Sequence, residues 1–187
     1  MEVEIKKALE VLKSGGTIIY PTDTIWGIGC DATSERAVQK VYKMKRRNEE
    51  KTMIVLLDDA EKIRKYVKKI PPIAFDLINT WEKPLTIIYD GAKNLAPNLI
   101  REDLSVAIRI TKDEFSNRLI REFGRPIVST SANISGDSAP LYFNQIRKEL
   151  LAEADYVVDL YHNSMNEMKA STIIRLDMDG SFEVLRP

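Results

Sequence analysis

The chain contains 187 residues, of which 44% are hydrophobic, and this size and composition favour one globular domain over a disordered or fibrous protein. The 28 basic residues balance the 28 acidic ones, which excludes a protein that holds nucleic acid by bulk charge alone. A single cysteine and a single histidine exclude a disulfide scaffold and a zinc site built from several thiolate or imidazole ligands.

Hydrophobic periodicity and turn residues predict helices and strands that interleave along the chain, with no linker, repeat or low-complexity segment. We expect helices over 4–13, from Ser34, from Asp58 with Glu61 as a capping box, from Pro71, over 114–123 and over 144–151. We expect strands over 17–20, 25–30, 53–57, 85–89, 106–110, 127–128 and 156–158, and a hairpin of 172–176 with 182–185. The pattern predicts a single α/β domain over residues 1–187 with a twisted, mostly mixed sheet and flanking helices.

The N-terminal residues are charged, and no run approaches the ~18 apolar residues that a membrane span needs. We therefore expect a soluble, cytoplasmic protein with no membrane partner.

Several weak motifs favour structural interpretations. The segment from Gly27 to Ala32 approximates the dinucleotide-binding glycine pattern, but it does not open a helix directly, which indicates tight turns near a strand. His162 could serve a hydrolytic triad with Ser129 or Ser131, yet neither serine has the flanking glycines of a nucleophile elbow. We interpret His162 as a solvated loop residue and Cys30 as a buried thiol.

Two polar segments carry candidate ligand-binding residues in the first third of the chain. Pro21-Thr22-Asp23-Thr24 follows a buried strand, where open α/β sheets bind ligands, although the same residues also suit a capped turn. Residues 40–51 carry six Lys or Arg and two Glu at the end of a helix. The helix dipole explains cations there, and phosphate binding is the functional alternative.

Two further segments lie in later strands. Arg109 ends the run Ser105-Val106-Ala107-Ile108, and a buried guanidinium needs a partner, either a ligand carboxylate or an internal acid. The segment from Ser129 to Gly136 has five hydroxyl or amide side chains after a core strand. It suits either a hydrogen-bonded loop or the recognition of a polar ligand.

Together these segments resemble the threonylcarbamoyl-AMP synthase family, the YrdC-like domain, nearly from end to end. The resemblance rests on ordered motifs, namely Gly16 to Gly29 with Pro21-Thr22-Asp23-Thr24, Lys45-x-Arg47 with Lys51, Trp81-x-x-Pro84-Leu85-Thr86, Val106 to Arg109, Ser129 to Gly136, and Ser171-Thr172 with Arg186. It implies a YrdC-like fold around a concave basic cavity. It also implies a nucleotidyltransferase that makes threonylcarbamoyl-AMP and pyrophosphate from L-threonine, bicarbonate and ATP for threonylcarbamoyladenosine modification of tRNA.

The resemblance also implies roles for particular residues. It assigns threonine binding to Thr24, Arg109, Ser129 and Thr172. It assigns nucleotide binding to Arg47, Lys51, Ser105, Ser131, Asn133 and Arg186. Lys45 and Arg47 would be the catalytic cations at the phosphates. ATP would be a substrate accompanied by Mg²⁺, with no protein metal site, and downstream threonylcarbamoyl-transferase proteins would be partners.

The chain departs from the family pattern at three places. Glu82-Lys83 replaces the glycine-containing turn before Pro84, Leu56 stands where many members carry His, and residues 160–170 replace the usual approach to Ser171-Thr172. These departures keep open an alternative function, a non-catalytic paralogue that binds double-stranded RNA, tRNA or a nucleotide. A carbamoyl-transfer domain like those of hydrogenase maturation proteins is disfavoured, because its companion domains are lacking.

Overall fold

The computed structural model describes residues 1–48, 53–162 and 170–187. The helical elements are α1 (Glu2–Lys13), α2 (Glu35–Met44), α3 (Ile73–Thr80), α4 (Glu114–Phe123) and α5 (Lys148–Glu153), with short 3₁₀ helices at Ala60–Lys65, Pro97–Leu99 and Phe143–Gln145. The strands are β1 (Ile18–Tyr20), β2 (Gly27–Gly29), β3 (Ile54–Leu57), β4 (Leu85–Tyr89), β5 (Val106–Ile110), β6 (Ile127–Ser131), β7 (Tyr156–Val157), β8 (Thr172–Leu176) and β9 (Phe182–Arg186).

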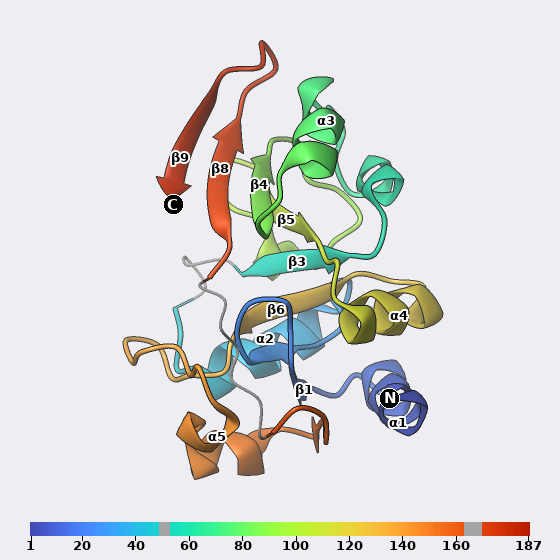
Figure 1. Cartoon of the computed structure of the whole chain (residues 1–187), viewed down its shortest axis with the longest axis vertical. Coiled ribbons are helices and arrows are strands. Elements are labelled where there is room, and N and C mark those ends of the chain that lie inside the picture. Colours follow the sequence, from blue (N-terminus) through green and yellow to red (C-terminus); the bar gives the residue numbers. More distant parts are fainter. Residues whose placement is uncertain (49–52, 163–169) are drawn as a thin grey trace.

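The strands of the described residues form one twisted sheet in the order β7-β1-β2-β6-β3-β5-β4-β8-β9 (Figure 1). Three neighbouring pairs are parallel, β1 with β7, β3 with β5, and β4 with β8. The other pairs are antiparallel, including the terminal hairpin of β8 and β9. The expected mixed sheet is confirmed.

Two hydrophobic clusters cover the sheet. The larger one joins α2 and Ala74 of α3 to inward residues of the central strands, such as Val55 and Ile108. The smaller one joins α1 and α4 to Leu56 and Ile127. Because side chains alternate along a strand, Val55 and Leu56 point to opposite faces and into different clusters. The helices α1 and α4 pack against each other beside β1, β3 and β6, away from β8 and β9 (Figure 1).

The strand register aligns one row of residues across the face of the sheet to which Leu56 points. Arg109 of β5 lies opposite Thr86 of β4, Thr86 is aligned with Ile173 of β8, and Ile173 lies opposite Arg186 of β9. Paired residues in a sheet project to the same side, so this row places two arginines on one face. That part of the face is where polar segments gather.

Local sequence signals explain most element boundaries. The helix α4 begins after Asp113, whose carboxylate accepts hydrogen bonds from the backbone of Phe115 and Ser116, and it ends at Gly124 with φ 74°. This is the combination of an acidic N-cap and a left-handed glycine that favours a sharply bounded helix. The predicted range of 114–123 is confirmed.

Two predicted helix starts are wrong. The cap after β3 is Asp59, not Asp58, and it begins a 3₁₀ helix. Asp58 instead pairs with Lys62 at 2.6 Å, so its carboxylate is not available to the helix backbone. The helix predicted over 144–151 begins later, at Lys148, since residues 143–145 form a separate 3₁₀ turn. Within the described ranges, no helix is long and apolar enough to cross a membrane.

Candidate functional site

A cavity of about 230 Å³ lies on the face that carries the aligned arginines. Residues from β2, β3, β5, β6, β8 and β9 line it, together with residues from the segments after β1, after α2 and before β8. They include Thr24, Ile25, Arg47, Ile54, Arg109, Ser129, Thr130, Ser131, Ser171, Ile173 and Arg186. Three guanidinium groups and several hydroxyl groups therefore face one space. Such a lining suits an anionic, polar ligand.

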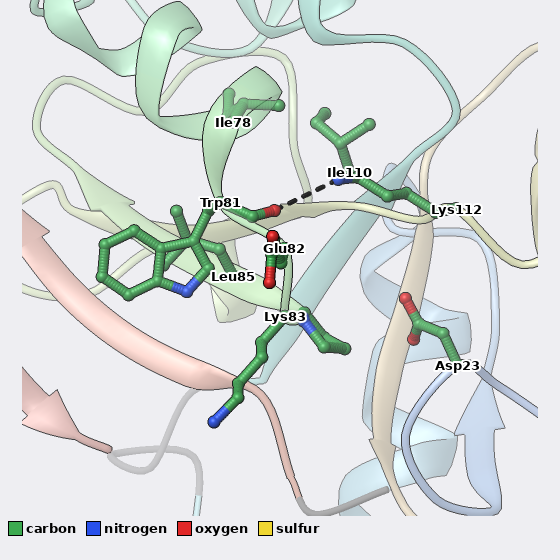
Figure 2. Close-up of a pocket in the computed structure, with 9 residues that line it drawn as sticks. Asp23, Ile78, Trp81, Glu82, Lys83, Leu85, Ile110 and Lys112 are labelled. Atoms are coloured by element: carbon green, nitrogen blue, oxygen red, sulfur yellow. Dashed lines mark hydrogen bonds between the residues drawn. The ribbon is translucent and has the colours of Figure 1, made fainter.

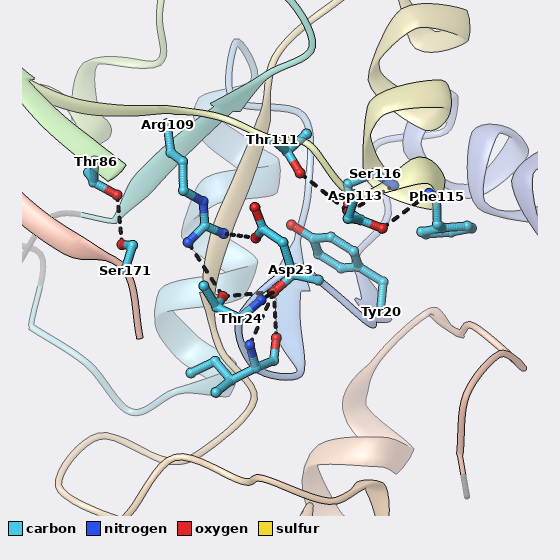
Figure 3. Close-up of polar contacts among 12 residues, drawn as sticks. Tyr20, Asp23, Thr24, Thr86, Arg109, Thr111, Asp113, Phe115, Ser116 and Ser171 are labelled. Carbon is cyan, nitrogen blue, oxygen red and sulfur yellow. Dashed lines mark hydrogen bonds and ion pairs between the residues drawn. The ribbon is translucent and has the colours of Figure 1, made fainter. Parts of the chain in front are cut away.

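Arg109 is buried at the back of this cavity, with 3% of its surface exposed. Its Nη2 lies 3.2 Å from Asp23 Oδ1, and its Nη1 donates a hydrogen bond of 3.4 Å to Thr24 Oγ1 (Figure 3). Of the two partners that the sequence left open for Arg109, the internal acid is present, and it is Asp23. Arg109 Nε, however, has no hydrogen-bond partner, so the guanidinium retains an unused donor.

The turn after β1 is shaped by Thr22 rather than by Thr24. Thr22 Oγ1 donates to the carbonyl of Ile25 at 2.7 Å and accepts from the backbone N–H of Thr24 at 3.1 Å. The capped turn is therefore present, since Thr22 closes it. Thr24 lines the cavity, and ligand binding by this segment stays a prediction.

Arg186 is fixed at the opposite side of the cavity by Ser171. Its Nε donates to the Ser171 carbonyl at 2.9 Å, and its Nη2 donates to Ser171 Oγ at 3.1 Å. Ser171 Oγ also lies 2.8 Å from Thr86 Oγ1, and both hydroxyl groups are buried (Figure 3). Since a guanidinium cannot accept a hydrogen bond, the Ser171 hydroxyl accepts from Arg186, while either hydroxyl can be the donor in the contact between Ser171 and Thr86. Burial, and to a lesser degree the charge of Arg109, lower the pKa of Arg186.

Lys45 is buried beneath the loop that follows β6. Its Nζ donates to the carbonyl groups of Ser131 at 2.5 Å and Asn133 at 2.7 Å, and it lies 3.3 Å from Asn133 Oδ1. Burial, assisted by the charge of Arg47, lowers the pKa of Lys45 to about 7. Only 1% of Lys45 is exposed, so it holds the loop and does not line the cavity.

The end of α2 explains how Lys45 and Arg47 come to face different surroundings. Arg46 has φ 48°, a left-handed conformation that reverses the chain after the helix. The backbone N–H of Arg47 then returns to the carbonyl of Tyr42 at 3.0 Å, and the Arg47 side chain lines the cavity. Burial lowers the pKa of Arg47. Two basic residues separated by one position thereby differ, because Lys45 holds the loop and Arg47 faces the cavity.

The structure brings some predicted site residues together and separates others. The residues that line the cavity are Thr24, Arg47, Arg109, Ser129, Ser131 and Arg186. The lining residues of that cavity do not include Lys45, Ser105, Asn133 or Thr172. Lys51 lies outside the described residues. Asn133 spans its loop instead, as its Nδ2 donates to the carbonyl groups of Ile134 and Asp137.

Strand alternation explains why Thr172 is replaced by its neighbour. Ser171 and Ile173 line the cavity, so Thr172, between them, projects to the other side. Sequence reasoning singled out the Ser171-Thr172 pair and named Thr172 for threonine binding, which stays a prediction, whereas Ser171 is the member of the pair that lines this cavity. The exact strand register, which the sequence does not reveal, would have been needed to choose between them.

The structure shows the surroundings of His162 and Cys30, the two residues for which the sequence favoured structural roles. His162 is not a solvated loop residue, because its ring stacks on Phe143 with centroids 3.7 Å apart and only 28% of its side chain is exposed. The expected buried thiol is confirmed, since Cys30 is fully buried and burial raises its pKa. Among the residues that the structure describes, no cluster of His, Cys, Asp and Glu could hold a metal ion.

Fold and cavity together define a mixed α/β protein with an arginine-lined polar site. A family model for Sua5, YciO and YrdC proteins, described as "Telomere recombination", matches residues 10–187. The chain therefore belongs to the Sua5/YciO/YrdC family. It is 34% identical over 158 residues to a threonylcarbamoyl-AMP synthase of Pseudoalteromonas translucida, covering 83% of this chain and 84% of that protein. It is 36% identical over 148 residues to the synthase of Psychromonas ingrahamii, covering 78% of each.

Solved structures agree with this assignment. P. abyssi Sua5 in complex with L-threonine superposes with a TM-score of 0.89 at 27% identity, over all of this chain and 54% of that one. The chain thus spans about half the length of that Sua5 protein. E. coli YciO superposes with a TM-score of 0.85 at 23% identity, over all of this chain and 89% of YciO, which shows the shared fold.

Proposed function

We propose that this protein is an L-threonylcarbamoyladenylate synthase, which makes threonylcarbamoyl-AMP and pyrophosphate from L-threonine, bicarbonate and ATP. The observation that supports it most is the cavity in which Arg47, Arg109 and Arg186 converge with Ser129 and Ser131. Relatives that cover most of the chain are named threonylcarbamoyl-AMP synthases, and the Sua5 neighbour binds L-threonine.

The residue set suits a reaction governed by positioning and charge. The threonine amine and bicarbonate form a carbamate with loss of water, and a carbamate oxygen then attacks the α-phosphorus of ATP while pyrophosphate leaves. Charge accumulates on phosphate oxygens during this step, and fixed guanidinium groups stabilise it without proton transfer. Holding the carbamate and the α-phosphate in contact supplies the rest of the rate enhancement.

We assign the substrates to opposite ends of the cavity. Arg109, with Thr24 and Ser129, would hold the carboxylate and hydroxyl groups of threonine. Arg47 and Arg186 would hold the triphosphate. Lys45 and Asn133 would act by shaping the loop that carries Ser131, not by contacting phosphate.

The described residues provide no carboxylate cluster for Mg²⁺ near these arginines. Mg²⁺ entering with ATP would therefore be held by phosphate oxygens and water, as is usual for a cation that keeps much of its hydration shell. The product would be consumed in the cytoplasm by threonylcarbamoyl-transferase proteins that modify tRNA.

Pyrophosphate release tests the proposal directly. Purified protein is incubated with ATP, L-threonine and bicarbonate, and release is compared with reactions that lack either threonine or bicarbonate. Release that needs all three supports the synthase. Loss of release in Arg186→Ala, with normal release in the surface control Arg64→Ala, would connect the activity to the cavity. Threonine-independent release, or salt-sensitive binding of double-stranded RNA without any release, would contradict it.

A further inference from the structure

The buried contact between Asp23 and Arg109 leaves one donor and one acceptor unused. Arg109 Nε and Asp23 Oδ1 are both buried and have no hydrogen-bond partner, although Oδ1 lies 3.2 Å from Arg109 Nη2. An unsatisfied buried polar atom lowers the stability of the folded protein, so two of them in one contact are not explained by stability. The pair is complementary to a ligand that offers an acceptor and a donor together.

Charge around the site points to the same kind of ligand. Among the described residues that line the 230 Å³ cavity, three are arginines and none is acidic. Asp23 is not among these lining residues, but its carboxylate contacts Arg109, which is one of them. A purely anionic ligand would gain nothing from a carboxylate at that position, whereas a zwitterion would.

Asp23 also borders a smaller cavity of about 120 Å³ beside Trp81 and Lys83 (Figure 2). Lys112, at the rim of this space, donates to the carbonyl of Trp81 at 3.2 Å. The cavity therefore leaves room for ligand atoms next to the Asp23 carboxylate. Figure 2 shows the Asp23 side chain lying across this space from the turn that carries Lys83.

We propose that Asp23 binds the α-ammonium group of the amino-acid substrate while Arg109 binds its carboxylate. This inference rests on the proposed function and adds the residue that selects an amino acid over other carboxylic acids. In an α-amino acid, the ammonium and carboxylate groups are attached to the same carbon, so one molecule can satisfy Asp23 Oδ1 and Arg109 Nε together. Ion-paired hydrogen bonds of this kind are the stronger ones.

Calorimetric titration with L-threonine and with 2,3-dihydroxybutanoate, the analogue in which a hydroxyl group replaces the amine, tests the assignment. In the wild-type protein, we expect threonine to bind at least 30-fold more tightly than the analogue. Asp23→Asn should reduce threonine affinity to the level of the analogue and leave the analogue's own affinity within threefold. Asp90→Asn, which removes an exposed carboxylate paired with Arg175, is the matched control and should change neither affinity.

Three results would overturn this inference and leave the proposed function standing. Equal binding of threonine and the analogue by the wild-type protein would do so without reference to any variant. An equal loss of affinity for both ligands in Asp23→Asn would show that Asp23 only orients Arg109. Unchanged threonine binding in a folded Asp23→Asn protein, judged by its thermal unfolding midpoint, would exclude a contact. Absence of threonine binding to the wild-type protein would instead contradict the proposed function itself, and this inference with it.

Discussion

Two carboxylates, the buried Glu4 and the half-buried Asp23, lie in different regions of the molecule and are satisfied to different degrees. Glu4 of α1 accepts hydrogen bonds from the Tyr156 hydroxyl, from the backbone N–H of Asp159 at 2.7 Å and from Lys7 at 3.3 Å. Burial alone would raise the pKa of Glu4, but these hydrogen bonds outweigh it and lower the pKa. Asp23 Oδ1 forms an ion pair with Arg109 Nη2 at 3.2 Å but has no hydrogen-bond partner.

The difference indicates what each region is for. The Glu4 region joins α1 to the segment around β7, and its polar groups are satisfied within the chain. The Asp23 region keeps unused hydrogen-bonding capacity beside a cavity, which lowers stability unless a ligand supplies the missing partners. Substitutions in the two regions should therefore separate stability from ligand binding.

The largest effect on binding is expected from Arg109→Ala. Removing a buried charged partner costs ~2–5 kcal/mol, so threonine affinity should fall by about 30-fold or more. Calorimetry with L-threonine measures this change, and Arg64→Ala, an exposed substitution, serves as the control. Retained affinity in Arg109→Ala would remove the argument for this region as the threonine site.

Glu4→Ala should show the opposite behaviour. It leaves the Tyr156 hydroxyl and the Asp159 N–H without their acceptor, and we expect the free energy of unfolding to fall by about 2–3 kcal/mol. Urea denaturation measures the loss, with Glu10→Ala on the exposed side of α1 as a reference. Threonine affinity should not change; a parallel loss of affinity would show that the two regions are coupled.

The lowered pKa of Lys45 should make the free energy of unfolding depend on pH. With a pKa of about 7 in the folded protein against an ordinary value of 10.5, the unfolded chain binds more protons than the folded one between these values. Stability from this residue therefore rises with pH above about 7, by at most about 1.4 kcal/mol per pH unit. Unfolding of wild-type and Lys45→Met proteins at pH 7.0 and 8.5 checks this, because the stability difference between them should shift in favour of wild type at pH 8.5. A pH-independent difference would mean that Lys45 stays protonated throughout.

The smallest effects are expected around the Arg186 side chain, the first of them from Ser171→Ala. It removes one hydrogen bond to the Arg186 guanidinium while the Ser171 carbonyl still accepts another. One such bond contributes ~0.5–1.5 kcal/mol, so KM for ATP should rise about fivefold with little change in kcat. Thr86→Val should raise the same KM less, and Thr86→Ser should restore it. A change in kcat with KM constant would argue that Arg186 acts on the chemical step.

Sequence reasoning succeeded where the controlling signal is local. The structure confirms the helix at 114–123 and the strands at 85–89, 106–110 and 172–176. These elements could be predicted because caps, glycines and β-branched runs mark them in the sequence. The site was harder, since contacts between distant segments decide it. Lys45 finds its acceptors 86 and 88 residues further along the chain, and no local pattern distinguishes a loop-holding lysine from a phosphate-binding one.

The spacing of the strands fixes the distance between the backbones of Arg109 and Arg186. These two residues are the ends of the aligned row that includes Thr86 and Ile173. Neighbouring strands are ~4.8 Å apart, so three steps set the two arginine backbones at roughly 14 Å from each other. Inserting one residue within β4 or β8 would shift every later side chain of that strand to the opposite face, whereas an insertion in a connecting loop would leave the spacing intact. Insertions and deletions in related sequences should therefore occur in the loops between strands and be rare within the strands.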